Sequence, residues 1–206
     1  MSRNLKLTGH AAVAVLAFAA VNVSAASAVL FHKTNMGPTV ITGGQVTQNV
    51  FEFPEITWQC EEVTFGSETE ETTPATLTVN PEFGKCRIAG DPKGAKVNMN
   101  GCDYVLHANG ETDVVCPEGK TIVITIALLK CTITIGAQTG LKSLEYTNNA
   151  DGTVTVTSAI AGIRYTMKGS GGAVCQETTE GVGATYTGSV KLEGTIGGSP
   201  ERIWVE

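Results

Sequence analysis

Three of the six cysteines and the longest runs of β-branched residues lie in one segment of the chain, Lys93 to Gln138. Within this segment, Cys131–Ile135 alternates apolar side chains with threonine, and a period of two is typical of a strand with one buried face. We therefore expect Cys131 to point its sulfur into the core. The run Thr121–Ile126 is apolar on both faces, which predicts a central strand that is covered on both sides or whose exposure changes along its length.

A hairpin is predicted around Asn109-Gly110, because both residues tolerate the positive φ values of tight turns. A two-residue turn at this dipeptide would place Cys102 opposite Pro117, whereas a longer loop places Cys102 opposite Cys116. We favour the longer loop, since a disulfide between directly opposed residues of neighbouring strands is geometrically easy.

The N-terminus has the layout of a secretory signal peptide. Arg3 and Lys6 precede the apolar run Ala11–Val23, and small residues follow it up to Ala28. We expect cleavage after Ala28, with Ala26 as the second choice, so that residues 1–28 are a signal peptide and residues 29–206 form a single domain. An uncleaved anchor helix is the alternative, but the apolar run is short for a bilayer span, and no membrane span is expected after cleavage.

The cysteines predict disulfide bonds in an oxidising compartment rather than a metal site. The closest two stand 14 positions apart, and zinc or iron–sulfur sites need closely spaced pairs of ligands. We therefore expect three disulfides and no metal or cofactor. Beyond Cys102–Cys116, we expect a nested arrangement that joins Cys86 to Cys131 and Cys60 to Cys175.

Many short alternating segments separated by turn residues predict an all-β fold, an antiparallel β-sandwich or a flattened barrel held by disulfides. The strongest hairpin signal joins Leu141–Thr147 to Thr153–Thr157 through Asp151-Gly152. No segment after the leader has the periodicity of a helix.

Catalytic patterns are sparse, and no catalytic residue is assigned. His107 follows Asp103 by four positions, and on one strand this spacing separates the two side chains by about 13 Å, too far for the hydrogen bond of a catalytic triad. His107 is therefore interpreted as a surface residue beside a turn. A thiol enzyme would need a free cysteine. A glycosidase needs two facing carboxylates, and the many glutamates leave that reaction open.

Charge limits the choice of partner. Cleavage removes two of the 14 basic residues and leaves 12 against 20 acidic ones, a net charge of −8. An acidic protein argues against nucleic acid or an anionic membrane as the partner, so we expect an extracellular ligand or protein. The segment from 52 to 82 carries eight glutamates without a basic residue, which predicts a solvated edge or a patch for cations or a basic partner.

Two aromatic residues share a predicted strand face with a cysteine. Trp58 lies two positions before Cys60, and Tyr104 lies two positions after Cys102. Large aromatic side chains beside inward-facing sulfurs are normally buried, so both are predicted to belong to the core rather than to a sugar-binding platform.

The chain also resembles a group of uncharacterised exported bacterial proteins, chiefly from actinobacteria. The similarity lies in Val97–Leu106, Cys116-Pro117, Ile122–Ile126, Cys131–Ile135 and Ser143–Asn148. It implies export, paired cysteines and one β domain, and it implies no activity, so no functional residue is transferred.

We therefore expect a secreted, non-enzymatic binding or structural β-sandwich domain at the cell surface or outside the cell, monomeric or weakly associating. One alternative is a carbohydrate-binding module or a glycosidase. Another is a subunit of an extracellular assembly that donates a strand to its neighbour. Its donor would be Val29–Gln48, which precedes the first cysteine.

Overall fold

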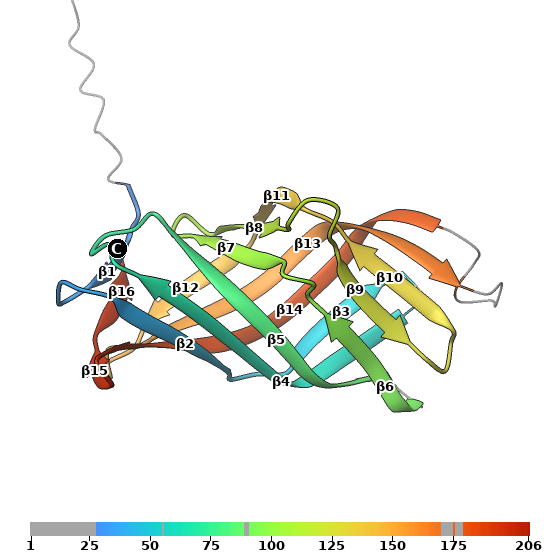
Figure 1. The fold of residues 1–206 in the computed structure, drawn as a ribbon, viewed down its shortest axis with the longest axis horizontal. Coiled ribbons are helices and arrows are strands. Elements are labelled where there is room, and N and C mark those ends of the chain that lie inside the picture. The colour runs from blue at the N-terminus through green and yellow to red at the C-terminus, as the bar shows by residue number, and fades with distance from the viewer. Residues whose placement is uncertain (1–27, 55, 89–90, 170–174, 176–178) are drawn as a thin grey trace, which may run out of the picture.

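The computed structural model describes residues 28–54, 56–88, 91–169, 175 and 179–206 (Figure 1). All regular elements in this part of the chain are strands, as predicted. The proposed signal peptide lies outside the described residues except for Ala28. In chain order the strands are β1 (Phe31–Lys33), β2 (Thr39–Gln45), β3 (Asn49–Phe53), β4 (Ile56–Thr69), β5 (Thr76–Ile88), β6 (Asp91–Asn98), β7 (Asp103–His107), β8 (Glu111–Val115), β9 (Ile122–Ile126), β10 (Cys131–Ile135), β11 (Gln138–Lys142), β12 (Leu144–Asn148), β13 (Val154–Gly169), β14 (Thr179–Ile196), β15 (Ser199–Glu201) and β16 (Ile203–Val205).

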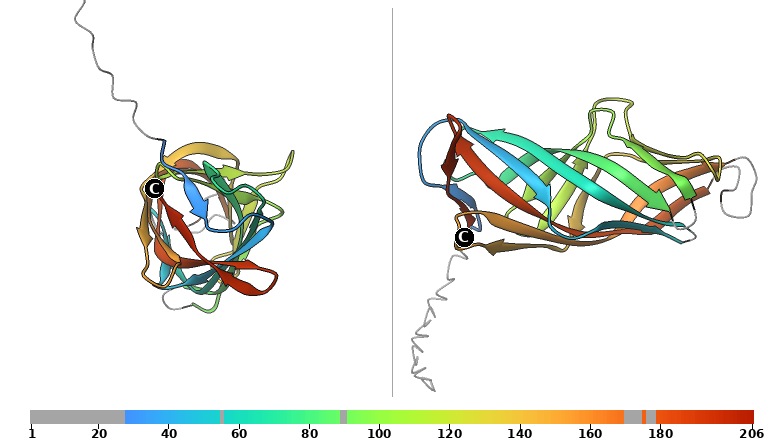
Figure 2. Two further views of the ribbon diagram at one scale, coloured as in Figure 1. Left: turned by 90° about the vertical axis from the view of Figure 1, so that its left-hand side faces the viewer. Right: turned by 90° about the horizontal axis from the view of Figure 1, so that it is seen from below.

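The main sheet closes on itself, so the fold is the flattened-barrel form of the predicted architecture. Antiparallel pairs run from β4 through β5, β6, β9, β10, β13, β14 and β2 and return to β4. Viewed along the long axis, these strands surround a common interior (Figure 2). The four longest strands, β4, β5, β13 and β14, extend along the molecule and give it its elongated form.

The main sheet branches at β5. The first half of β5 pairs with β7 and the second half pairs with β6, so β7, β8 and β11 form a branch of the sheet. β12 pairs with one edge of β13. β1 pairs with β16 in a separate two-stranded sheet. The β12–β13 hairpin is the one predicted, but its first strand starts later than expected. Ser143 has a φ of +88°, and the two residues before it pair with β8 instead.

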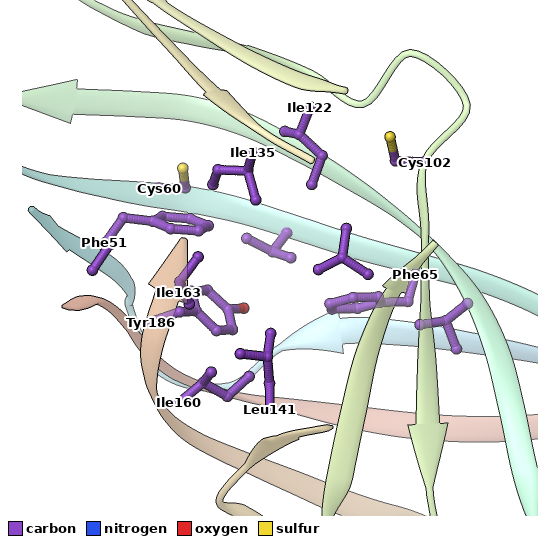
Figure 3. Packing of buried hydrophobic residues seen from close by; sticks show 14 of the residues in the cluster. Phe51, Cys60, Phe65, Cys102, Ile122, Ile135, Leu141, Ile160, Ile163 and Tyr186 are labelled. Atoms are coloured by element: carbon purple, nitrogen blue, oxygen red, sulfur yellow. The ribbon is translucent and has the colours of Figure 1, made fainter. Parts of the chain in front are cut away.

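The core fills the interior of the closed sheet (Figure 3). Cys131, Ile133 and Ile135 are all buried, as the alternation in β10 predicts. In β9 the three isoleucines are buried, whereas Val123 is half-buried and Thr125 is exposed, so exposure changes along the strand and only one face is fully covered.

The predicted aromatic core is also present. Trp58 is 1% exposed, and its rings stack on Phe51 and Phe53 at centroid distances of 5.2 and 4.7 Å. Tyr104 is half-buried and packs against the same core. Trp58 therefore provides no sugar-binding platform on the surface, because its ring faces are covered by other aromatic side chains.

The three disulfides confirm one predicted pairing and correct two. Cys102 is bonded to Cys116, and the β7–β8 register is the one in which these residues stand opposite each other. The nested pairs Cys86–Cys131 and Cys60–Cys175 were wrong: Cys60 is bonded to Cys86, and Cys131 to Cys175. The reason lies in the strand order. Cys60 and Cys86 are direct partners on the neighbouring strands β4 and β5. Cys131 stands opposite Gly169 at the end of β13, six positions before Cys175.

Candidate functional site

Two adjoining hollows lie on the outer wall where β10 ends and β11 begins. One has a volume of about 580 Å³ and the other of about 340 Å³. They share Gln138 and Arg164, so we treat them as one site and call it the outer groove. It is lined by Thr121, Thr134, residues 136–143, Ala161, Gly162, residues 164–166 and residues 180–182.

The outer groove exists because β13 lacks a strand partner over part of one edge. Pairing with β10 stops at Thr166, and pairing with β12 starts only at Ser158. Between these points β13 bulges, and Gly162 supplies a φ of +76° that other residues rarely adopt. β11 runs past this edge but pairs with β8 on its other side, so the wall stays open between β11 and β13.

A single side chain joins the two walls of the opening. Gln138 is buried, and its Oε1 accepts a hydrogen bond from the Arg164 N–H at 3.0 Å. Its Nε2 donates to the Arg164 carbonyl at 3.2 Å. The carboxamide thus satisfies the donor and the acceptor that a neighbouring strand would otherwise pair, and it fixes the backbone of Arg164.

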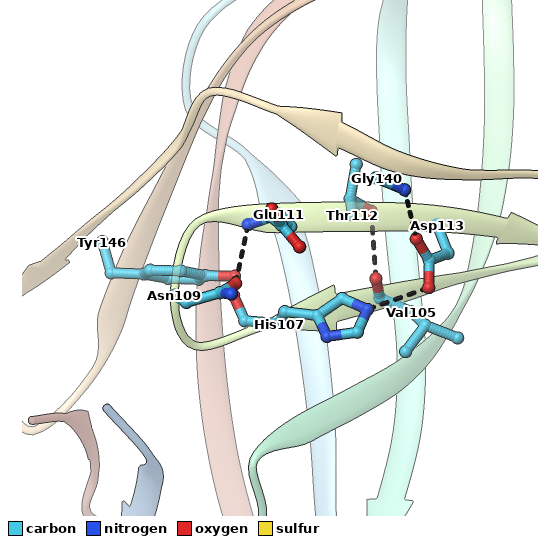
Figure 4. Close-up of polar contacts among 8 residues, drawn as sticks. All are labelled: Val105, His107, Asn109, Glu111, Thr112, Asp113, Gly140 and Tyr146. Atoms are coloured by element: carbon cyan, nitrogen blue, oxygen red, sulfur yellow. Dashed lines mark hydrogen bonds and ion pairs between the residues drawn. The ribbon is translucent and has the colours of Figure 1, made fainter. Parts of the chain in front are cut away.

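The β11 wall is held from behind by a histidine–aspartate pair (Figure 4). Asp113 Oδ1 accepts the Gly140 N–H at 2.8 Å, and its Oδ2 lies 2.9 Å from His107 Nε2. Burial acts to raise the pKa of Asp113, but the bonds from Gly140 and His107 outweigh it and hold that pKa below its ordinary value. The pair therefore positions the bulge of β11 that lines the outer groove.

From the sequence, His107 was predicted to be a surface residue, and Asp103 was the carboxylate considered as its partner. The structure shows a half-buried ring that bonds Asp113, across the hairpin, while Asp103 accepts a hydrogen bond from Asn80. The predicted pairing of β7 with β8 places Asp113 opposite Val105, two positions from His107. This signal could have identified Asp113 as the partner of His107. No hydroxyl or thiol of the described residues bonds the His107 ring, so its contacts are those of a positioning pair rather than of a nucleophile and its base.

The outer groove presents hydroxyls, backbone groups and few charges. Thr121, Thr134 and Thr166 line it, and Glu180 is the one carboxylate among its described lining residues. Lys142 is occupied by an ion pair with Glu111 at 3.2 Å. Within the described part of the chain, the Arg164 guanidinium has neither an ion pair nor a hydrogen bond. The outer groove thus combines several hydroxyls with one cation that has no partner among the described residues.

The interior also holds a cavity, but it is too small to be the site. Its volume is about 50 Å³, and apolar side chains line it together with the buried Asn49–Tyr186 hydrogen bond of 2.5 Å. A cavity of about 150 Å³ is the size that accommodates benzene. The internal space is therefore a packing void rather than a place for an organic ligand.

The other tryptophan, Trp204, is half-buried and already contacts several neighbouring side chains. His32 stacks on Trp204 at 5.1 Å, and the Arg202 guanidinium lies 5.6 Å from the Trp204 ring centre. The indole N–H donates to Glu206 at 3.2 Å. These contacts commit Trp204 to the small sheet formed by β1 and β16.

Neither a metal cluster nor a membrane helix occurs in the part of the chain that the structure describes. No three His, Cys, Asp or Glu side chains converge there as metal ligands would. Among the same residues, no helix is long and apolar enough to cross a membrane. The chain matches no protein-family model, no curated protein sequence and no solved structure.

Proposed function

We propose that this chain is a secreted binding protein that acts outside the cell or at its surface and holds a polar, hydroxyl-bearing ligand in the outer groove. One observation carries the proposal: two hollows of about 580 and 340 Å³ meet at Arg164, whose guanidinium has no partner among the described residues. Small-molecule sites usually measure about 300–1,000 Å³ and contain a few placed polar groups. The outer groove has that size and that kind of lining.

Export is supported by the cysteines and the leader. All six cysteines are paired, and disulfides form and persist in oxidising compartments. The predicted signal peptide of residues 1–28 agrees with this location. Glycans carry many hydroxyls, which the threonine hydroxyls and the arginine of the outer groove can bond, so a glycan segment is the ligand class we favour.

Binding is favoured over glycoside hydrolysis because of the carboxylates. A glycosidase places two carboxyl groups about 5 to 9.5 Å apart on either side of the bond that breaks. Among the described residues that line the outer groove, Glu180 is the only one with a carboxylate. The threonine hydroxyls and the Arg164 guanidinium can hold a sugar, but one carboxylate does not supply both the acid and the second group.

Strand donation receives less support from the position of the donor segment. The first part of Val29–Gln48 forms β1, which pairs with β16, and the second part forms β2. β2 lies between β14 and β4 and is one of the strands that close the main sheet. Donating it to a neighbour would open the chain's own sheet, so we place this function behind ligand binding.

Gly136 lines the outer groove and offers a position at which a large side chain can be introduced to block it. A Cβ added to Gly136 would meet no atom within 4 Å, and the residue does not need a positive φ. The Cβ of a substituted residue therefore has room at Gly136, and we expect the indole of Gly136→Trp to occupy the outer groove. Thermal unfolding of the variant checks that the fold is retained. Gly44 on β2 has the same freedom but lies outside the groove, so Gly44→Trp is the matched control.

The test is binding of the purified wild-type protein and both variants to an array of neutral and acidic glycans. We expect the wild type and Gly44→Trp to retain the same glycans, and Gly136→Trp to lose them. Equal binding by Gly136→Trp and the wild type would contradict the proposal, as would an array on which the wild type retains nothing.

A further inference from the structure

We propose that the ligand of the outer groove is an acidic sugar whose carboxylate binds to Arg164. This inference rests on the binding function proposed above and narrows it to one ligand chemistry. It follows from three features of the described residues: the fixed position of Arg164, the lack of a partner for its guanidinium, and the balance of charge around it.

Arg164 is held in place by its backbone, which leaves its side chain free to serve a ligand. Both backbone polar groups are bound by Gln138, at 3.0 and 3.2 Å. The side chain is exposed on the outward face of β13 and lines both hollows. Because the backbone is already fixed, a ligand has only the side-chain torsions of Arg164 to order when it binds.

A guanidinium matches a carboxylate better than it matches a neutral sugar hydroxyl. Its N–H donors form a planar fork that can bond both oxygens of a carboxylate at once, and such charge-assisted bonds are about twice as strong as neutral ones. The nearby threonine hydroxyls can donate and accept bonds to the remaining hydroxyls of a sugar ring. A sugar acid uses both kinds of group.

Glu180 is close enough to share the ligand but does not neutralise Arg164. Thr166 stands opposite Glu180 in the β13–β14 register, and Arg164 stands opposite Val182, so Arg164 and Glu180 are diagonal neighbours on one face. Diagonal residues are typically about 7–8 Å apart, and no ion pair joins these two among the described contacts. Glu180 can therefore accept hydroxyl donors from the same sugar whose carboxylate binds Arg164.

The overall charge favours a ligand with isolated negative charges rather than a dense polyanion. The whole chain carries 14 basic and 20 acidic residues, a net charge of −6. Lys142, the other cation in the outer groove, is already paired with Glu111. The guanidinium that has no partner among the described residues can pair with a single carboxylate, whereas a run of sulfates or phosphates would meet the repulsion of an acidic protein.

The experiment compares a galactose trisaccharide that carries one galacturonic acid residue with its carboxyl-reduced counterpart, a neutral trisaccharide of the same linkage, by isothermal titration calorimetry. We expect the wild type to bind the acid at least about tenfold more tightly, the size of effect that a charge-assisted hydrogen bond supplies. Arg164→Gln should abolish that preference, and Arg164→Lys should recover only part of it because lysine lacks the planar fork.

Lys168→Gln is the matched control for loss of one positive charge. Lys168 is exposed on the same outward face of β13 but does not line the outer groove. Its replacement should leave the preference for the acid unchanged, and thermal unfolding of each variant verifies that the fold is retained. Equal loss from Lys168→Gln and Arg164→Gln would overturn the assignment of Arg164, since it would show only a general effect of charge.

The failure of this inference can be told apart from the failure of the proposed function. Suppose that a neutral glycan binds, that Gly136→Trp removes this binding and that Arg164→Gln leaves it unchanged. The outer groove is then a binding site, and the acidic-sugar assignment is wrong. If the wild type binds the acid and the reduced trisaccharide equally, the assignment is also wrong. Acid-specific binding that depends on Arg164 and is blocked by Gly136→Trp supports both proposals.

Discussion

Gln138 binds the backbone of Arg164 through both ends of its carboxamide, at 3.0 Å for the accepted bond and 3.2 Å for the donated one. The two residues are 26 positions apart in the sequence, and β11 is not paired with β13 through backbone hydrogen bonds among the described residues. One side chain thus takes the place of a strand at the point where the wall of the closed sheet is open. The shape of the outer groove depends on this contact.

Replacing Gln138 with leucine should destabilise the protein. The variant leaves the part-buried N–H and carbonyl of Arg164 without their side-chain partner, and an unsatisfied buried polar group costs about 1–3 kcal/mol. We expect a loss of free energy of unfolding in that range, measured by urea denaturation. Thr139→Ala, at the exposed neighbouring position, should have little effect. A Gln138→Leu variant as stable as the wild type would show that the carboxamide does not hold the two walls.

The Asp113 pair should make stability depend on pH in acid. The folded-state pKa of Asp113 lies below the ordinary value of 3.8, so its ionised form stabilises the fold above that pH. This stabilisation is lost as the pH falls through the folded-state pKa. Asp113→Asn should therefore be less stable than the wild type at about pH 7, with a smaller difference at about pH 2.5. Urea denaturation at both values measures the difference, and a constant gap would contradict the account.

The sequence predicts those features that depend on neighbouring residues. Alternation places Ile133 in the core, and the Asn109-Gly110 loop places Cys102 opposite Cys116, because both follow from local strand geometry. Predicting the correct partner of Cys60 requires the order of the strands in the sheet, and the alternation of apolar and polar residues does not reveal that order. The outer groove needed still more, since Gln138 and Arg164 meet only after β10, β11 and β13 have taken their places in the closed sheet.

The three disulfides should contribute unequally to stability. Cys131–Cys175 closes a separation of 44 positions and Cys102–Cys116 one of 14. The loop-entropy relation predicts about 4 kcal/mol for the former and about 3 kcal/mol for the latter. Paired Cys→Ser variants of each bridge, unfolded by urea without reductant, give the comparison. A larger loss from the shorter loop would show that native-state contacts, rather than loop length, set the contributions.

The buried hydrogen bond beside the internal cavity should matter more than a similar bond near the surface. Tyr186 donates to Asn49 Oδ1 in the core, so Tyr186→Phe leaves a buried acceptor unsatisfied and should cost about 1–3 kcal/mol. Tyr146 donates to the His107 carbonyl at 2.8 Å in a partly exposed place, where water can replace it. Tyr146→Phe is the comparison, and thermal unfolding of the two variants should show the smaller loss for Tyr146→Phe. Equal losses would argue against this ranking.

The most direct test of the outer groove as the binding site is to locate a bound ligand on the protein. Amide NMR spectra recorded with and without the tightest-binding glycan from the array would map the contact residue by residue. We predict that the largest changes gather at Gly136, Arg164 and Thr166. Changes gathered instead around His32 and Trp204, on the separate sheet of β1 and β16, would contradict the account and move the site to the other end of the molecule.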